Sequence, residues 1–364
     1  VCLYTRLSLP LHIFKILYRH KAENYRTKQD IQMKQTLKSA LLSAVLLAAS
    51  ICTVTADDDI NRKTYENPVI PSSTPDPTII KCEEDGFYYL YGTEDTRNMP
   101  IYRSKNLVDW IFVGTAFNEA SRPACAGPNS GAGLWAPDIN YINGQYVLYF
   151  SIGVWGQTEK CGVGVATSDR PEGPFVDRGV LFRSQDIGVT FSIDQFYIEE
   201  DGHKYMFWGS FRGIWAIELA DDGLSLKPGA GKRKIAGDQY EGTYIHKRDG
   251  YYYLIVSTGD FMKDYHVVVG RSRSLMGPYV DRAGRDMLGV HHELVVGNGN
   301  GFVAPGHNAE FVTDDKGQDW MLYHTRLEVG GPRYLILDRI EWNDGWPEVR
   351  GHVPARSAEA PVFE

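Results

Sequence analysis

Four acidic residues and one histidine stand just upstream of similar strand-like segments in this chain. They are Asp76, Asp138, Asp194, Glu241 and His307. Each lies 6 to 10 residues before a glycine that opens a run of aromatic and aliphatic residues, and Asp138 fits this spacing least well. A single aspartate at such a place is usually a turn residue. Recurrence at five places favours a shared position in a repeated fold, where the five side chains would converge.

Converging carboxylates are the groups that hydrolyse glycosidic bonds. One protonated acid donates a proton to the leaving oxygen, while an ionised carboxylate activates water on the opposite face of the sugar. A pair placed across a channel, about 6.5–9.5 Å apart, inverts the anomeric centre. A third carboxylate would hold the proton and the orientation of the acid, because neighbouring carboxylates raise one another's pKa. These residue types indicate a glycoside hydrolase.

The segments that must position these residues are copies of one phrase. DGFYYLYGT at 85–93 recurs as NGQYVLYFS, DGHKYMFWGS, DGYYYLIVST and KGQDWMLYHT, beginning at 143, 201, 249 and 316. Each copy is a tight turn that leads into a buried strand. Five units of roughly 50–60 residues, each with room for about four strands, predict an all-β fold, a five-bladed β-propeller. The alternative, a pair of β-sandwiches, would not be expected to repeat one hairpin five times.

The last part of the chain carries further strand-like sequence. RYLILDRIEWNDGWPEV at 333–349 is expected to complete the last blade, or to close the ring against the first blade and so remove an exposed sheet edge.

With these motifs the chain resembles the five-bladed propeller hydrolases of glycoside hydrolase family 43. The resemblance extends from NPVIPSSTPDPTII at 67 to EWNDGWPEV at 341–349. PDPTII resembles the first-blade motif of the general base, which implies that role for Asp76. SIDQFYIEEDGHKYMFWGSF resembles the third-blade motif whose aspartate tunes the pKa of the acid and orients it, which implies Asp194. YEGTYIHKRDGYYYL resembles the fourth-blade motif of the general acid, which implies Glu241.

Within this family the chain looks most like the arabinan endo-1,5-α-L-arabinanases. The likeness rests on WGSFRGIWAIEL, VVVGRSRSLMGPYVDRAG, APGHNAEF and WNDGWP. It implies inverting cleavage of α-1,5-L-arabinofuranosidic bonds in arabinan. It also implies a metal, usually calcium, near the propeller axis, held largely through water, with His307 as its histidine. From the shared WAPD motif, Trp135 and Asp138 are expected to bind substrate.

Two departures from the arabinanase pattern leave alternatives open. The first motif reads PDP, with Pro75 where histidine is usual, and the fifth-blade segment YHTRLEVGGPRYL at 323–335 also differs. Arg326 in that segment is expected to bind substrate. If the enzyme is an exo-acting α-L-arabinofuranosidase or β-xylosidase, Arg326 would belong to its closed pocket. A carbohydrate-binding propeller without catalysis is the alternative from another functional class. The presence of all three acids argues against it.

The N-terminal segment indicates export. From Met33, MKQTLKSALLSAVLLAASICTVTADDD has a short basic start, an apolar run and a small-residue VTA before Asp57. This pattern predicts a signal peptide over 33–56 and a secreted or periplasmic catalytic domain over 57–364. A lipid anchor on Cys52 is the alternative. Residues 1–32 are interpreted as sequence upstream of the true start.

Composition limits the partners. A formal net charge of −8 without a basic cluster argues against nucleic acid, and 22 tyrosines and 8 tryptophans suit a surface on which sugars stack. The three cysteines after residue 57 allow at most one disulfide, Cys125 with Cys161. We expect a monomer without an organic cofactor or stable membrane insertion, acting on plant cell-wall polysaccharide built from arabinose or xylose.

Overall fold

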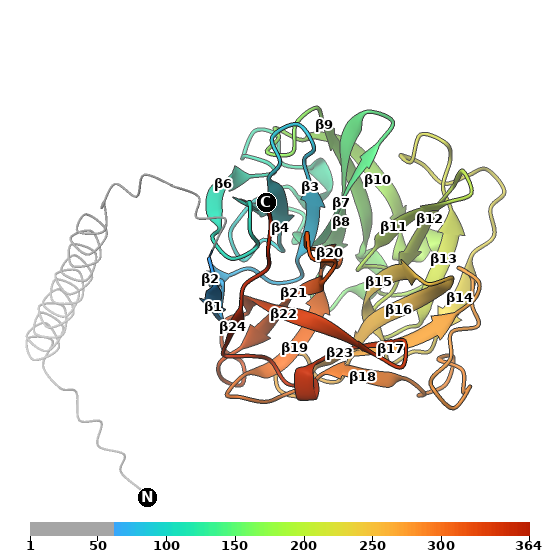
Figure 1. The fold of residues 1–364 in the computed structure, drawn as a ribbon. Helices are drawn as coiled ribbons and strands as arrows, with labels where there is room; N and C mark the ends of the chain where they lie inside the picture. Colours follow the sequence, from blue (N-terminus) through green and yellow to red (C-terminus); the bar gives the residue numbers. More distant parts are fainter. Residues whose placement is uncertain (1–61) are drawn as a thin grey trace, which may run out of the picture. The chain divides into compact units, whose positions relative to one another are not determined.

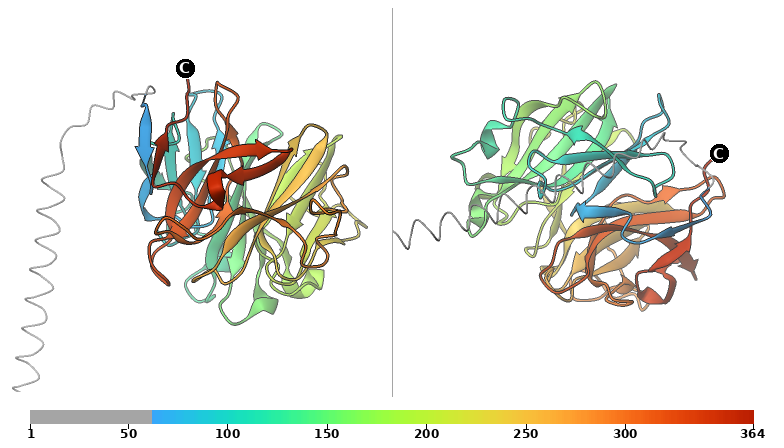
Figure 2. Two further views of the ribbon diagram at one scale, coloured as in Figure 1. Left: turned by 60° about the horizontal axis from the view of Figure 1, so that its bottom comes forward. Right: turned by 90° about the vertical axis from the view of Figure 1, so that its left-hand side faces the viewer.

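The computed structural model describes residues 62–364. The predicted signal peptide, the alternative anchor on Cys52 and the interpretation of residues 1–32 therefore lie outside the described residues. Five antiparallel sheets follow one another along the described chain and stand side by side around a common centre (Figures 1 and 2). The predicted five-bladed β-propeller is confirmed.

The first four blades each contain four strands in chain order. Blade I contains β3 (Thr78–Lys81), β4 (Tyr88–Tyr91), β5 (Pro100–Ser104) and β6 (Ile111–Thr115). Blade II contains β7 (Gly133–Ile142), β8 (Gln145–Gly153), β9 (Gly162–Ser168) and β10 (Val176–Arg183). Blade III contains β11 (Phe196–Glu200), β12 (His203–Trp208), β13 (Ile214–Glu218) and β14 (Arg233–Ala236). Blade IV contains β15 (Glu241–Arg248), β16 (Tyr251–Thr258), β17 (His266–Ser272) and β18 (Glu293–Val296).

Blade V joins the two ends of the described chain. Its strands are β19 (Val303–Asn308), β20 (Val312–Thr313), β21 (Asp319–Arg326), β22 (Tyr334–Asn343), β23 (Trp346–Val349) and, from the N-terminal side, β2 (Ile70–Ser73). A separate two-stranded sheet pairs β1 (Thr64–Glu66) with β24 (Ser357–Glu359). The segment 333–349 thus completes the last blade as expected, whereas the strand that closes the ring is β2, which pairs with β22.

Helical structure is confined to short connections among the described residues. They are η1 (Ala124–Ala126), η2 (Thr158–Lys160), α2 (Ser184–Ile187) and η3 (Arg350–His352). Within residues 62–364 no helix has the length and apolar character that a membrane span requires. The Cys125–Cys161 disulfide that the sequence allowed is not formed, and both thiols are free.

The core lies between neighbouring blades, and the repeated phrase supplies it. The second strand of each blade, which follows the turn glycine, is mostly buried, and β4 and β21 are buried along their whole length. Aromatic residues of one blade pack on those of the next, as Phe117 and Phe150 do between blades I and II, with ring centroids 5.8 Å apart. Burial of such side chains holds the ring together, at about 25 cal/mol for each Å² of apolar surface removed from water.

Asn67 ties the ring closure together. Its side-chain amide donates to the carbonyl oxygens of Leu337 (2.8 Å) and Ala355 (2.9 Å), and its side-chain oxygen accepts the N–H of Leu337 (2.9 Å). Because Asn67→Ala would leave these buried groups without partners, we expect the free energy of unfolding to fall by about 2–3 kcal/mol. Urea unfolding would measure this, with the exposed Gln185→Ala as control. An unchanged urea midpoint for Asn67→Ala would contradict the role of Asn67 in closure.

A residue in the left-handed backbone conformation lies within, or just before, the innermost strand of every blade. These residues are Asp76, Ala136, Asp194, Gly242 and His307, with φ of 53°, 33°, 58°, 63° and 47°. Non-glycine residues adopt this conformation rarely, so the four non-glycine occurrences, with Gly242 as the fifth, mark one structural position repeated in each blade. We call the end of the propeller at which these five residues lie the mouth. Glu241 precedes the blade IV position by one residue, and Asp138 follows the blade II position by two.

Candidate active site

Three acidic side chains and a histidine gather at the mouth. Asp76, Asp194 and His307 occupy the left-handed positions of blades I, III and V, and Glu241 precedes that of blade IV. His307 lies among the carboxylates, with its Nδ1 atom 3.3 Å from Asp76 Oδ1. Burial lowers the pKa of His307, but attraction to Asp76 and to the other two carboxylates outweighs this and raises it to about 9. The structure therefore brings together the three acids that the sequence singled out.

Asp76 is held as an ionised carboxylate. Arg333 donates to both of its oxygens at 3.0 and 3.1 Å, and the Thr93 hydroxyl donates to Oδ2 at 2.6 Å. Burial by itself would raise the pKa of Asp76, but the charges of Arg333 and His307 and the hydrogen bond with His307 hold the pKa well below its usual range. A carboxylate that stays ionised in a buried site can take a proton from water.

Glu241 and Asp194 have the opposite tendency. Burial raises the pKa of Glu241, although hydrogen bonds from Ser210 (2.6 Å) and Tyr265 oppose the shift. Burial, together with the charges of Glu241 and Asp76, raises the pKa of Asp194 to about 8. Because the two groups interact, their titration belongs to the pair. The mouth thus holds one ionised carboxylate and, near neutral pH, a protonated acid, the combination that general acid–base catalysis needs.

His307 was expected to hold a metal through water, and this stays a prediction. Within residues 62–364 no three His, Cys, Asp or Glu side chains are grouped so as to ligate a metal directly. Water-mediated binding does fit one observation: Asn308 Oδ1, in the same GHN motif, is buried without a hydrogen-bond partner. His307 itself could bind only in its neutral form, through the Nε2 atom that faces away from Asp76.

Trp135 lies at the mouth, as expected. It immediately precedes the left-handed Ala136, so it occupies in blade II the place that Glu241 occupies in blade IV. A side chain at Gly153 would lie 2.0 Å from the Trp135 ring, so glycine makes room for the indole. The Trp135 ring also lies beside Trp155, with the two ring centroids 4.9 Å apart. Trp155 is 73% exposed. Two adjoining indoles offer an apolar surface on which a sugar ring can stack.

Asp138 does not join this group. It lies inside the innermost strand β7, is 2% exposed, and accepts the backbone N–H of Tyr197 in blade III at 2.7 Å. Thr78 and Glu310 bond in the same way to backbone N–H groups of the next blade, those of Ile139 (3.2 Å) and Ile79 (2.9 Å). Burial and the nearby Glu310 raise the pKa of Asp138 well above its usual range. The geometry therefore gives Asp138 a role in joining blades II and III in place of the expected contact with substrate.

Arg326 does not point at the carboxylates either. It is 5% exposed at the end of β21, and its guanidinium donates to the carbonyl oxygens of Phe261 (3.1 Å) and Gly331. It thereby ties the loop after β16 to the loop after β21. The arginine that contacts Asp76 is Arg333, seven residues further on in the segment that the sequence had singled out.

Sequence reasoning also missed smaller contacts at the site. Thr93 and His324 contact Asp76, and Ser210 contacts Glu241. The signal was present, because these residues lie at or next to the ends of the repeated phrases LYGT, LYHT and FWGS. The phrase was interpreted only as a buried strand.

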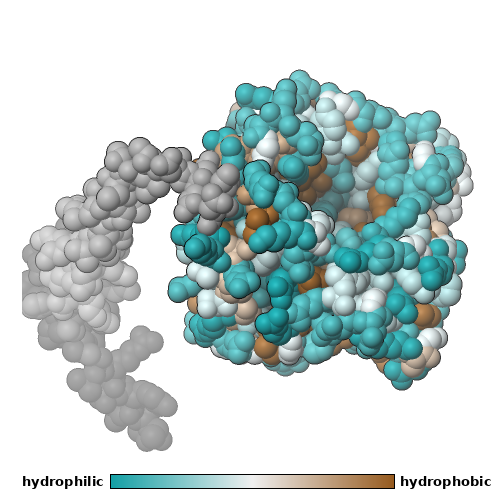
Figure 3. Space-filling model, in the orientation of Figure 1, coloured by the Kyte–Doolittle hydropathy of each residue, from teal (hydrophilic) through white to brown (hydrophobic). Residues whose placement is uncertain are grey.

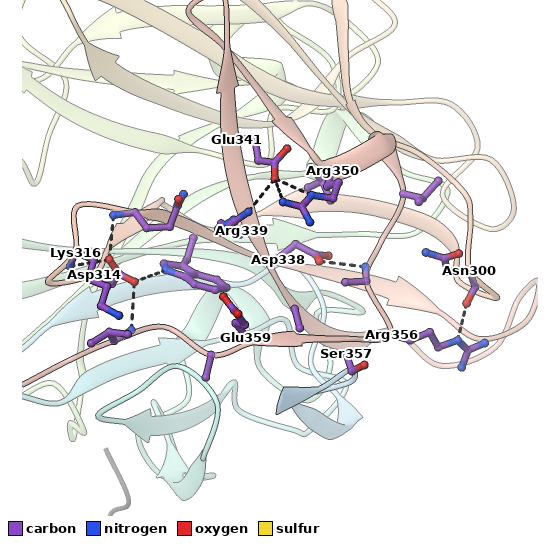
Figure 4. Close-up of a pocket in the computed structure, with 18 residues that line it drawn as sticks. Asn300, Asp314, Lys316, Asp338, Arg339, Glu341, Arg350, Arg356, Ser357 and Glu359 are labelled. Carbon is purple, nitrogen blue, oxygen red and sulfur yellow. Dashed lines mark hydrogen bonds and ion pairs between the residues drawn. The ribbon is translucent and has the colours of Figure 1, made fainter. Parts of the chain in front are cut away.

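A cavity of about 850 Å³ lies away from these residues (Figure 4). It is bounded by blade V and by the C-terminal segment that carries β24, and it contains none of the residues at the mouth. Several of its charged side chains are engaged with one another or with the backbone: Glu341 accepts from Arg339 (2.9 Å) and Arg350, and Arg356 donates to the carbonyl oxygen of Asn300. The face seen in Figure 3 is largely hydrophilic, with some hydrophobic residues near a central hollow.

Comparisons with known proteins agree with this geometry. The chain is 32% identical over 298 residues to an arabinan endo-1,5-alpha-L-arabinosidase C of Emericella nidulans, covering 75% of this chain and 91% of that protein. It is 30% identical over 303 residues to an extracellular exo-alpha-(1->5)-L-arabinofuranosidase of Cellvibrio japonicus, covering 75% and 85%. The solved alpha-L-arabinanase of Cellvibrio cellulosa in complex with arabinohexaose superposes with a TM-score of 0.68 at 28% identity, covering 78% of this chain and 99% of that one. A family model, described as glycosyl hydrolases family 43, matches residues 65–347, and the chain belongs to that family.

Proposed function

We propose that this chain is an inverting hydrolase that cleaves α-1,5-L-arabinofuranosidic bonds within arabinan. The observation that carries the proposal is the division of the carboxylates: Arg333 and His307 keep Asp76 ionised, while burial raises the pKa of Glu241 in the same site. The similar proteins named for endo-acting and exo-acting arabinan cleavage support arabinan as the substrate class. A secreted location, through the signal peptide over 33–56, is part of the proposal.

In the proposed reaction each carboxyl group has one task. Asp76 takes a proton from water, and the resulting hydroxide attacks the anomeric carbon of the arabinofuranosyl unit from the face opposite the leaving oxygen. As the glycosidic bond breaks, Glu241 donates its proton to that oxygen, which leaves as the hydroxyl group of the next sugar. We assign to Asp194 the tuning and orientation of the acid: its pKa and that of Glu241 depend on each other, and its carboxylate accepts the N–H of Gly242, the residue that follows the acid. Water is consumed, and the anomeric configuration is inverted.

The proposal assigns substrate contacts to Trp135 and its exposed neighbour Trp155. An indole stacks on the apolar face of a sugar ring without fixing its hydroxyl groups. A calcium ion near His307, if bound, would add positive charge close to the carboxylates. Asp138 and Arg326 keep the structural tasks described above.

An exo-acting enzyme is the second candidate, and one observation favours it. Arg326 and a hydrogen bond from Gly330 N–H to the Met262 carbonyl oxygen (3.2 Å) join the loops after β16 and β21. Each loop follows the second strand of its blade. Glu241 pairs with Ser257 near the end of β16, and Gly306, next to His307, pairs with His324 near the end of β21. Because Glu241 and His307 lie at the mouth, both loops lie there too. Loops joined there could close one end of a substrate groove.

The products released from linear arabinan decide between the two modes. We expect early release of oligosaccharides of mixed length, measured by chromatography of a time course, because an open groove admits internal bonds. Release of only arabinose or of one short product from the start would favour the exo-acting enzyme. Aryl-arabinofuranoside and aryl-xyloside substrates would be assayed in parallel with linear arabinan, to separate arabinofuranosidase from xylosidase activity. Binding of arabinan without cleavage of any substrate would indicate the non-catalytic alternative.

A further inference from the structure

The left-handed residues at the mouth are held by side chains from the preceding blade. The acceptor in each case lies at or near the end of the second strand of that blade. The bonds run from Ala136 N–H to Thr93 Oγ1 (2.7 Å), from Asp194 N–H to Ser151 Oγ (2.9 Å), from His307 N–H to Ser257 Oγ (2.8 Å) and from Asp76 N–H to His324 Nδ1 (3.2 Å). In blade III the equivalent Ser210 donates to Glu241. Four blades therefore use a hydroxyl group at this position, and blade V uses an imidazole.

His324 is buried and fixed in one orientation. It is 1% exposed, and its ring stacks on Tyr265 at a centroid distance of 5.9 Å and an interplanar angle of 13°. Burial lowers the pKa of His324 to about 4, despite the nearby Asp76, so the ring is neutral. Nδ1 accepts the N–H of Asp76, which places the single ring proton on Nε2, an atom that is buried without a hydrogen-bond partner among the described residues.

This protonation state matters for the carboxylate of Asp76. Nδ1 lies 3.3 Å from Asp76 Oδ1, yet an accepting nitrogen has no proton to donate to it. A hydroxyl group at the same place could donate to the carboxylate, as Thr93 does on Oδ2 and as Ser210 does to Glu241. A further hydrogen bond to the ionised form would make Asp76 a weaker base.

We propose that His324 is a positioning residue for Asp76. It holds the backbone of Asp76 in the left-handed conformation, and so aims the carboxylate at the mouth, without donating a hydrogen bond to it. This inference rests on the proposed function, in which Asp76 is the general base. His324 acts through Asp76 and does not contact the substrate.

The test compares two amide replacements. In His324→Asn the side-chain oxygen can take the place of Nδ1, whereas in His324→Gln the amide reaches toward the place of Nε2. We expect His324→Asn to keep kcat within about threefold of the wild type, and His324→Gln to lose about 10- to 100-fold in kcat with little change in KM, because small misplacements of a reacting group cost rates of this order. His324→Phe, which keeps the ring stacked on Tyr265 but has no acceptor, is expected to behave like His324→Gln.

Thr325→Val is the matched control. Thr325 is the next residue on β21, is buried, and donates to the carbonyl oxygen of Val303 (3.0 Å) and not to Asp76. Thermal unfolding of all variants separates lost stability from lost rate, and we expect Thr325→Val to unfold earlier with an unchanged kcat. Equal losses in the Asn and Gln variants, or full kcat in the Gln variant, would overturn the inference alone. A wild-type protein that cleaves neither arabinan nor an aryl-arabinofuranoside would overturn the proposed function and this inference with it.

Discussion

The Glu241→Gln variant is expected to hydrolyse linear arabinan about 1,000-fold more slowly than the wild type. Glutamine keeps the size of the side chain and can still accept the hydrogen bond from Ser210, but it has no proton to give to the leaving oxygen. General acid catalysis contributes about 10²- to 10⁴-fold, and a sugar alcohol leaves slowly without it. Reducing-sugar release under saturating arabinan measures the change in kcat.

A substrate that does not need the acid provides the control for this prediction. An aryl-arabinofuranoside with a strongly electron-withdrawing leaving group should be cleaved with a much smaller loss, because its phenolate departs without protonation. The alkaline limb of the wild-type pH profile, where Glu241 gives up its proton, should disappear in the variant on the same substrate. Equal losses on both substrates would show that Glu241 is not the acid.

The second large effect is expected for Asp76→Asn. An amide cannot take a proton from water, so the attack step should slow by about 1,000-fold on arabinan and on the activated aryl substrate alike. The equal loss separates this variant from Glu241→Gln. The substitution also leaves Arg333 and His307 without their carboxylate, so far-UV circular dichroism and thermal unfolding must accompany the rates. Asp169, whose carboxylate is exposed at an outer turn, provides the control variant Asp169→Asn. Wild-type rates for Asp76→Asn would show that Asp76 is not the base.

The fold could be predicted because one phrase of sequence recurs with each blade. Its turn glycine and its buried strand are local features, so five copies already specify five hairpins. The closing strand β2 could not be found in this way, because IPSS carries no part of the phrase. Its place is set only by pairing with β22, more than 260 residues away, and such pairing leaves no local pattern.

The site residues could be predicted where acid–base chemistry requires a carboxylate. Asp76, Asp194 and Glu241 were identified, whereas the alignment in blade II slipped by two residues from Ala136 to Asp138. Side chains alternate along a strand with a period of two, so a slip of two residues keeps the same face and goes unnoticed. The left-handed backbone of Ala136, visible only in the structure, reveals it.

The choice between the two arginines depended on a loop. Arg326 and Arg333 are both charged, both lie near the end of a strand, and both belong to the segment that differs from the arabinanase pattern. The path of residues 327–332 turns Arg326 toward the carbonyl oxygens of Phe261 and Gly331 and brings Arg333 to Asp76. No property of either residue in the sequence distinguishes them.

The closure of the ring by β2 has a consequence for the order in which the enzyme becomes active. Asp76 follows that strand by three residues, while Arg333, His324 and His307, which surround its carboxylate, are among the last sixty residues of the chain. The surroundings of the proposed base are therefore complete only when the first and the last parts of the described chain have met. During synthesis, four finished blades would already present Asp194 and Glu241, while Asp76 would still lack Arg333, His324 and His307. On the proposed mechanism, catalytic competence coincides with the end of folding, and we expect an incomplete chain to be inert toward polysaccharide.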